Sequence, residues 1–574
     1  MSALLYPALL FEMAAVVALL LLVFAVPRRT ARLLEVLERR LALLPLSLGR
    51  QLLIVALAAI AFRAALLPWL GPPTPLIHDE HSLLLQARTL LEGRLANPSH
   101  PLWPYFQTFH VNQTPAYASV YFIGRALPLV LGLLLADMPW LGVWVCFVLL
   151  AMGMVWMLRA FVGPRTALAG GLLVVLRLGG GSYWINSYWG GALTALGAVL
   201  VLGAMVRLLK EPRWRDGLLL GLGALIMMIT RPYEGALTCA ALGLFALPRL
   251  LSSGGAQIGR TALRGGVPLL VCVALGAGAT LAYNKATTGD LMLTPYEVNR
   301  STYAIAPAFM LSGPVKHYEN AERVPSHFTR FYVNEARDYN DAHRSLAGLG
   351  AALARKSMIL WIFYIGPALT IPFLAGLYAI RRNYLVIGTL GLLYLGYLPT
   401  SWDLPHYVSP ALPFVMVIVM HGFTAMRDWT KRPNSGGAAL LRGSYLLTGA
   451  PTLLLVVHLS SGWPALPNDS WHQPCCAIAQ SSPHSEVVER LTSLPGRDLV
   501  LVTDNEASPI HNELVWNGPD IDAEPIVFAH SFDPEADRRL IDYFGERRIW
   551  RFSWVDDGYA LSQLRDENPA MATR

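Results

Sequence analysis

The sequence predicts a polytopic α-helical membrane protein with about twelve transmembrane helices, additional interfacial helices and a small C-terminal α/β domain outside the membrane. Of its 574 residues, 54% are hydrophobic and only 14% are charged, whereas soluble domains carry about 25% charged residues. Apolar stretches of the ~20 residues that cross a bilayer recur along most of the chain. This composition excludes an ordinary soluble enzyme.

The distribution of basic residues orients the chain in the membrane. The formal net charge is +7, and most lysines and arginines lie in short loops between apolar stretches, as the positive-inside rule requires. This pattern accounts for the charge without a nucleic-acid partner. Arginines place the segment 27–50 in the cytoplasm, so the loop 71–117 lies outside. The expected spans are 3–26, 50–70, 140–159, 166–181, 192–209, 215–230, 234–250, 266–283, 357–380, 384–400, 408–426 and 440–460.

One apolar stretch, 117–136, is left out of the spans. Counting it would invert every later loop and place the basic turns outside, and Arg125 and Pro128 interrupt it. We expect a re-entrant or interfacial helix here. The transmembrane domain then covers 1–460 and includes a second long external loop at 284–356.

The tail, 461–574, has the pattern of a small α/β domain. The apolar run 498–504 is typical of a buried strand, and 525–530 of a second one. Residues 534–544 are helix-like, with a proline in the first turn and acidic residues nearby. Residues 547–554 alternate like a third strand. The predicted topology places this domain outside the membrane.

The first external loop opens with two adjacent carboxylates, Asp79 and Glu80, between His78 and His81. The spacing predicts that Asp79 caps an amphipathic helix that ends before Gly93 and lies along the membrane surface. A carboxylate here can also act as a general base that takes a proton from an acceptor hydroxyl. Glu80 would orient the acceptor or share that role. A cap leaves one carboxylate oxygen free, so both interpretations stay open.

His78 and His81 raise the question of a metal. Four consecutive residues cannot all point at one ion from a helix or a strand, so a metal site would need ligands from elsewhere in the chain. The sequence therefore predicts solvated loop histidines and assigns no metal ligand. A requirement for a divalent cation stays open.

Cationic and aromatic residues at outward turns are candidates for binding a lipid phosphate or a sugar. Arg231 either binds a phosphate or pairs with a neighbouring acid, and His406 with Tyr407 forms a second donor pair. Tyr188 and Trp189 belong to an aromatic run. That run forms either an interfacial belt or a platform on which sugar rings stack.

The order of these features resembles the GT-C superfamily of membrane glycosyltransferases. A span is followed by an external loop with an Asp-Glu pair, an amphipathic helix, a proline- and aromatic-rich stretch (98–117) and a re-entrant segment. The most similar branch holds protein O-mannosyltransferases and lipid A aminoarabinose transferases. In that family the loop acid is the catalytic base, which falls on Asp79. The turn Pro405-His406-Tyr407 resembles the family's late arginine-tyrosine turn, with histidine in place of arginine.

The resemblance implies a mechanism, a donor and a location. A polyprenyl-phosphate sugar would be the lipid-linked donor, with its phosphate held by Arg231, His406 or Lys285. Asp79 would deprotonate a hydroxyl of a glycan, lipid or protein acceptor, and the oxygen would attack the anomeric carbon with inversion. The active site and the C-terminal domain would lie on the periplasmic side of a bacterial inner membrane.

Three other functions stay open at this point. An oligosaccharide-transferring, ligase-like enzyme differs from a monosaccharide transferase only in the size of the donor glycan. A lipid or glycan transporter would also be a basic-inside helical bundle, but it should carry charges near the middle of several spans, where this chain has few. A non-catalytic assembly protein would bind its partner through the tail and would not need the Asp79-Glu80 pair.

Overall fold

The computed structural model describes residues 7–25, 47–310, 312, 325–430, 448–461, 470–476, 482–505, 508–511, 513–555 and 558–564. Contacts along the chain divide it into two compact units, each built from three separate segments. The helical unit consists of 1–73, 140–278 and 350–478, and the loop unit of 74–139, 279–349 and 479–574. The segments of the loop unit correspond to the two long loops and the tail that the sequence placed outside the membrane.

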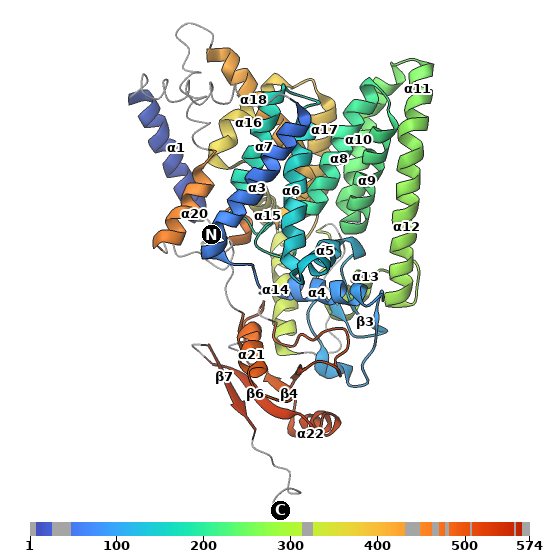
Figure 1. The fold of residues 1–574 in the computed structure, drawn as a ribbon, viewed down its shortest axis with the longest axis vertical. Helices are drawn as coiled ribbons and strands as arrows, with labels where there is room; N and C mark the ends of the chain where they lie inside the picture. Colours follow the sequence, from blue (N-terminus) through green and yellow to red (C-terminus); the bar gives the residue numbers. More distant parts are fainter. Residues whose placement is uncertain are drawn as a thin grey trace, which may run out of the picture. The chain divides into compact units, whose positions relative to one another are not determined.

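The helical unit is a bundle in which α8 packs on α9, α16 on α18 and α10 on α17, as Figure 1 shows. Its elements are α1 (Pro7–Ala25), α3 (Leu48–Leu70), α6 (Pro139–Leu158), α7 (Pro164–Leu178), α8 (Ala192–Lys210), α9 (Trp214–Thr230), α10 (Pro232–Leu251), α11 (Gly255–Thr261), η4 (Ala262–Gly266), α12 (Val267–Thr288), α15 (Leu346–Leu360), η6 (Trp361–Ile365), α16 (Gly366–Ala379), α17 (Tyr384–Tyr397), η7 (Pro405–Ala411), α18 (Leu412–Thr430), α20 (Ala450–Ser461) and η8 (Ser470–His472).

A helix overlaps the described part of each segment that the sequence predicts to span the membrane. Residues 3–6, 26 and 440–447 of these segments lie outside the described residues. Within the described part of the chain, 7 helices are long and apolar enough to cross a bilayer by length and composition. These helices confirm a polytopic helical membrane protein. The expected count of about twelve spans stays a prediction.

Two glycines allow α16 and α18 to approach closely. A Cβ atom at Gly422 would lie 1.7 Å from the carbonyl oxygen of Pro372, and one at Gly376 would lie 1.9 Å from that of Ile418. Small residues permit this kind of backbone approach between membrane helices. Any larger side chain at either position would force the two helices apart.

One buried ion pair joins α1 to α7 inside the helical unit. Arg177 Nη1 lies 3.5 Å from Glu12 Oε1. The same guanidinium donates hydrogen bonds to the carbonyl oxygens of Phe363 at 3.0 Å and Ile362 at 2.8 Å. Charged groups within spans are costly unless they are paired, and here both charges have partners.

The loop unit combines short helices with two small sheets. Its elements are α4 (His78–Leu91), β1 (Asn97–Pro98), η2 (Trp103–Phe106), β2 (Val111–Asn112), β3 (Ala116–Ser119), η3 (Ile123–Arg125), α5 (Leu127–Ala136), α13 (Pro295–Tyr303), α14 (Ser326–His343), α21 (Pro483–Thr492), β4 (Asp498–Thr503), β5 (Ile526–His530), α22 (Pro534–Tyr543), β6 (Arg548–Val555) and β7 (Gly558–Gln563). Thus β4, β5, α22 and β6 lie where the sequence predicts two strands, a helix and a third strand.

The four-stranded sheet has the order β5-β4-β6-β7, with β4 parallel to both β5 and β6, and β7 antiparallel to β6. Because side chains alternate along each strand, the two faces of the sheet contribute to two separate hydrophobic cores. On one face Val500 and Phe528 pack with Val487 of α21. On the other face Leu499 packs in a core that also contains Leu85 of α4. The tail and the first external loop therefore share one hydrophobic core.

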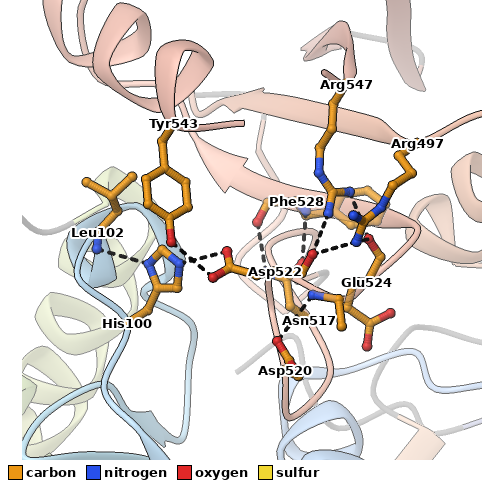
Figure 2. A network of polar contacts seen from close by, with 11 residues as sticks. His100, Leu102, Arg497, Asn517, Asp520, Asp522, Glu524, Phe528, Tyr543 and Arg547 are labelled. Atoms are coloured by element: carbon orange, nitrogen blue, oxygen red, sulfur yellow. Dashed lines mark hydrogen bonds and ion pairs between the residues drawn. The ribbon is translucent and has the colours of Figure 1, made fainter. Parts of the chain in front are cut away.

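Polar contacts also join the tail to the first external loop, and Figure 2 shows one such network. The His100 ring accepts a hydrogen bond from the Leu102 N–H at 2.9 Å, and its Nε2 lies 3.1 Å from Asp522 Oδ1. The hydroxyl of Tyr543 donates to Asp522 Oδ2 at 3.0 Å. Arg547 donates to the carbonyl oxygen of Asp522 at 2.9 Å. Asp522 is therefore held on both its carboxylate and its backbone.

The apolar stretch 117–136 forms the end of β3, the short turn η3 and the 10-residue helix α5. A helix of that length is about 15 Å long, half the ~30 Å hydrocarbon core. The interpretation of this stretch as a re-entrant or interfacial helix stays a prediction. Leu127, Leu134 and Leu135 are exposed along α5, which fits an interfacial or re-entrant helix.

Candidate functional site

The site is built on the first turn of α4. The helix begins at His78 with Ile77 as its N-cap residue. Glu80 Oε2 accepts hydrogen bonds from the backbone N–H groups of Leu76 at 2.8 Å and Ile77 at 3.2 Å. The prediction that Asp79 caps this helix is wrong, because Glu80, three residues after the N-cap, reaches back to the free N–H groups. Asp79 is left available for other contacts.

Asp79 lies among three polar side chains. Its Oδ2 is 3.0 Å from His78 Nδ1 and 3.9 Å from His110 Nε2, and its Oδ1 accepts a hydrogen bond from the Tyr121 hydroxyl. The Asp79 side chain is 19% exposed. His110 has a φ of 58°, a left-handed conformation that is uncommon outside glycine.

The prediction of solvated histidines at His78 and His81 is wrong, because both side chains are buried. The His78 ring packs against Phe109 with 4.9 Å between centroids. The His81 ring packs against Trp516 at 4.9 Å and His484 at 5.4 Å. Both histidines are thus covered by residues that come from distant parts of the sequence.

The electrostatics of the cluster favour an ionised Asp79. Burial alone would raise the pKa of the Asp79 carboxyl, but His110, His78 and Tyr121 together hold it well below its usual range. Burial lowers the pKa of His110 to about 3, against the opposing effect of Asp79. Burial also lowers the pKa of His81 well below its usual value. At neutral pH the site therefore combines a carboxylate with uncharged His110 and His81 rings.

The same cluster has the ligand set of a cation site. Asp79 offers one oxygen and His78 and His110 one nitrogen each, and these three atoms lie within 4.8 Å of one another. His78 Nδ1 is buried and lies 3.0 Å from Asp79 Oδ2, so these two ligand atoms already face each other. Two imidazoles and a carboxylate form the three-ligand set of many catalytic zinc sites. The residues present therefore fit a divalent cation of this type.

The helical unit brings several predicted binding residues together. The Arg231 guanidinium lies 4.4 Å from the centre of the Tyr407 ring and 3.6 Å from the Glu234 carboxylate. The ring of His406 lies 4.5 Å from that of Tyr407 and 4.7 Å from that of Trp189. Arg231 is buried, and its Nη2 atom has no hydrogen-bond partner among the described residues. The cluster thus contains a buried cation with a free donor.

Tyr188 and Lys285 each donate a hydrogen bond to a backbone carbonyl group. The Tyr188 hydroxyl donates to the carbonyl oxygen of Pro73 at 2.8 Å, which holds the loop after α3. Lys285, near the end of α12, donates to the carbonyl oxygen of Gly289 at 2.6 Å. Tyr188 is buried, so it is not part of an exposed aromatic belt.

Sequence reasoning missed His110, Tyr121 and His511. The first two follow Asp79 within the same part of the chain, where a proline- and aromatic-rich stretch marked a folded loop but not these partners. His511 comes from the tail, and its Nδ1 lies 3.2 Å from His78 Nε2. No local pattern could have paired residues so far apart in sequence.

Comparisons with solved structures find glycosyltransferases at low identity. ArnT from Cupriavidus metallidurans bound to undecaprenyl phosphate is 14% identical, over 89% of this chain and 94% of that chain, with a TM-score of 0.45. The oligosaccharyltransferase of Archaeoglobus fulgidus in complex with Zn and sulfate is 11% identical, over 79% of this chain, with a TM-score of 0.43. This chain covers 60% of the length of that structure.

A third structure is the archaeal oligosaccharyltransferase AglB from Archaeoglobus fulgidus with an inhibitory peptide and a dolichol-phosphate. It is 10% identical, over 88% of this chain and 69% of that chain, with a TM-score of 0.41. ArnT and AglB are both GT-C superfamily members, the superfamily that the sequence resembles. No protein-family model and no curated protein matches the chain. Likenesses of this degree assign no function, which has to be argued from the residues of the site.

Proposed function

We propose that this protein is an inverting membrane glycosyltransferase that moves a sugar from a polyprenyl-phosphate donor to an acceptor hydroxyl. The observation that carries the proposal is Asp79, an ionised and partly exposed carboxylate at the start of α4 in a polytopic membrane protein. A general base must be unprotonated and within reach of its substrate. The low pKa of Asp79 supports the first requirement, and its partial exposure supports the second. The proposed location is the periplasmic face of a bacterial inner membrane.

Asp79 takes the proton from the acceptor hydroxyl in this mechanism. The acceptor oxygen forms a bond to the anomeric carbon while the bond from that carbon to the phosphate oxygen breaks, and the lipid phosphate leaves with the electron pair. Tyr121 donates to Asp79 Oδ1, which fixes the orientation of the carboxylate. His110 and His78 line the other oxygen. The low pKa of Asp79 keeps the base ionised at neutral pH.

Arg231 is the proposed receptor for the donor phosphate. A buried guanidinium with an unused N–H group gains a charge-assisted hydrogen bond when a phosphate oxygen binds. Stacking on Tyr407 holds the guanidinium plane in place. His406 is the second proposed donor at this turn. Lys285 and Tyr188, which bind backbone carbonyl groups, have weaker support as binding residues.

A cation-assisted form of the same reaction is the second candidate, and the His78-Asp79-His110 group favours it. A divalent cation held there would supply positive charge close to the acceptor oxygen. Asp79 would then serve as a ligand, and its role as base would be reduced. The two forms differ in their response to chelation.

The test of the proposed function is a panel of radiolabelled donors supplied to membranes that contain the full chain. The panel includes polyprenyl-phosphate monosaccharides and lipid-linked oligosaccharides, and membranes without the chain serve as the control. We expect transfer from a monosaccharide donor. Transfer from an oligosaccharide donor alone would favour the ligase-like alternative, and transfer from none would contradict an enzymatic role with these donors.

A further inference from the structure

The loop unit contains a second buried cluster of charges, separate from the ligand group at Asp79. Its members are His327 at the start of α14, Asp504 directly after β4, Glu513, and His530 at the end of β5. All but Asp504 are buried, and the Asp504 side chain is only 14% exposed. The cluster therefore joins one long external loop to the tail. We refer to these four residues as the histidine clamp.

Both ring nitrogens of each clamp histidine face an oxygen. His327 Nδ1 lies 3.2 Å from Asp504 Oδ2, and His327 Nε2 lies 3.7 Å from Glu513 Oε2. His530 Nδ1 lies 3.1 Å from the same Asp504 oxygen, and His530 Nε2 lies 2.8 Å from the carbonyl oxygen of Gln107. A neutral imidazole has only one N–H donor. His327 faces a carboxylate oxygen from each of its ring nitrogens, so both of its contacts are matched only when its ring is an imidazolium cation.

The clamp holds the segment 107–110 by its backbone. His530 donates to the Gln107 carbonyl oxygen, and the Phe109 N–H donates to Glu513 Oε2 at 3.4 Å. The Phe109 ring packs against His327 with 5.2 Å between centroids. The next residue, His110, adopts the left-handed φ of 58°, a conformation that persists only when its surroundings enforce it.

His110 and Phe109 are also neighbours of the proposed catalytic residue. His110 Nε2 lies 3.9 Å from Asp79 Oδ2, and the Phe109 ring packs on His78. A shift of segment 107–110 would therefore change what lines Asp79, although no clamp residue touches Asp79 among the contacts described above. Displacements of about 1 Å in supporting residues can cost on the order of 100-fold in rate.

We propose that His327, Asp504, Glu513 and His530 are positioning residues that hold segment 107–110, and with it His110, against Asp79. This assignment gives the tail and the long external loop a part in catalysis. It deepens the proposed function and rests on it. The clamp itself, however, is a feature of the fold that can be measured without any donor.

The charges around the clamp predict its response to pH. Burial alone would lower the pKa of His327, but Asp504 and Glu513 raise it to about 9. Burial alone would raise the pKa values of Asp504 and Glu513, but the two histidines hold both below their usual range. The nearby charged group is Arg330 of α14, which donates to the backbone oxygens of Asn505 and Ser508. The other titratable groups nearby are His511 of the tail and His110 of the first loop, and the low pKa of His110 leaves its ring uncharged at neutral pH.

Because the folded pKa of His327 is raised, its contribution to stability is complete below the ordinary histidine value of about 6.5. It is lost as the pH rises through about 9. The depressed carboxylates of Asp504 and Glu513 act at the other end, since their contribution is lost on acidification. The clamp is therefore expected to loosen above pH ~9 while Asp79 is still ionised.

Two substitutions at His530 separate its two contacts. His530→Gln keeps an N–H donor near the position of Nε2, which faces Gln107, and His530→Asn keeps one near the position of Nδ1, which faces Asp504. His100→Asn is the matched control, because His100 also joins the first loop to the tail, through Asp522, and none of the contacts described here for His100 involves segment 107–110. All variants are made in the full chain in membranes or detergent.

We expect His530→Asn to lower kcat by on the order of 10- to 100-fold with little change in the donor KM. Hydrogen–deuterium exchange of segment 107–110 should become faster in the same variant. His530→Gln should stay closer to the wild type in both measurements, and His100→Asn should match the wild type. In the wild type, exchange of this segment relative to its intrinsic rate should rise above pH ~9.

Wild-type kcat in His530→Asn, or unchanged exchange of segment 107–110, would overturn the proposal. Equal losses in His530→Asn and His100→Asn would also overturn it, because they would indicate general loosening of the loop unit. If the wild type transfers no sugar from any donor, the proposed function fails. In that case, hydrogen–deuterium exchange still shows whether the histidine clamp holds segment 107–110.

Discussion

The hydrogen bond from Tyr121 to Asp79 gives a prediction that can be worked out from the structure. Tyr121→Phe removes the hydroxyl that donates to Asp79 Oδ1. The ring remains, with its contacts to Arg125, whose guanidinium lies 4.2 Å from the ring centre, and to His110 at 5.7 Å. The substitution therefore isolates one hydrogen bond at the proposed base.

A hydrogen bond to a charged group contributes about 1.5–3 kcal/mol. Since one pKa unit corresponds to about 1.36 kcal/mol, loss of this bond should raise the pKa of Asp79 by about one to two units. Asp79 has a depressed pKa, so the stability and activity that depend on its ionised form are lost as the pH falls through that pKa. Tyr121→Phe moves this loss toward higher pH.

The assay is the pH dependence of kcat/KM for the wild type and for Tyr121→Phe. The acid limb should move upward by about one to two pH units, while the rate at neutral pH changes little because Asp79 remains ionised there. An acid limb that stays in place would refute the reasoning. A uniform drop in rate at every pH would show that the hydroxyl acts on something other than the ionisation of Asp79.

Three further results are expected. Glu80→Ala should lower the free energy of unfolding by about 0.5–2 kcal/mol, as for loss of a helix cap. Glu80→Gln should lower it by less, because the amide oxygen still accepts from Leu76 and Ile77. Equal melting temperatures for both variants and the wild type would contradict this expectation. Arg231→Lys should raise the KM for the donor several-fold, because lysine cannot stack its charged group flat on the Tyr407 ring. The cation–π energy of that stacking is about 0.5–2 kcal/mol. An unchanged KM in a donor titration would show that Arg231 does not bind the donor phosphate. A metal-free base predicts that EDTA leaves transfer unchanged, whereas transfer that is lost to EDTA and restored by zinc would favour the cation-assisted form.

The sequence was most informative where a pattern repeats over many residues. Apolar runs located the helices of the bundle, because burial in lipid requires long uninterrupted stretches. The apolar runs at 498–504 and 525–530 and the alternation at 547–554 located strands of the tail. No repeating pattern predicts that the tail shares a hydrophobic core with the first external loop, because that packing depends on contacts between segments that are distant in sequence.

The candidate site was predictable only in part. The position of Asp79 in the first external loop predicts directly that the site includes this residue. The start of α4 was placed wrongly because Asp79 and Glu80 are both good first-turn residues, and only the backbone shows that Glu80 reaches the free N–H groups. The burial of His78 and His81 depends on Phe109, Trp516 and other residues remote in sequence, and no local periodicity predicts it.

The most direct test of the central claim is sugar transfer by Asp79→Asn beside Asp137→Asn, both compared with the wild type. Asp137 is an exposed acid in the left-handed conformation at the end of α5, which asparagine also tolerates. If Asp79 is the general base, its substitution should lower the transfer rate by roughly 100- to 10,000-fold in a protein that still folds, while Asp137→Asn transfers at the wild-type rate. Equal transfer by all three proteins would contradict the account and leave Asp79 without a catalytic role.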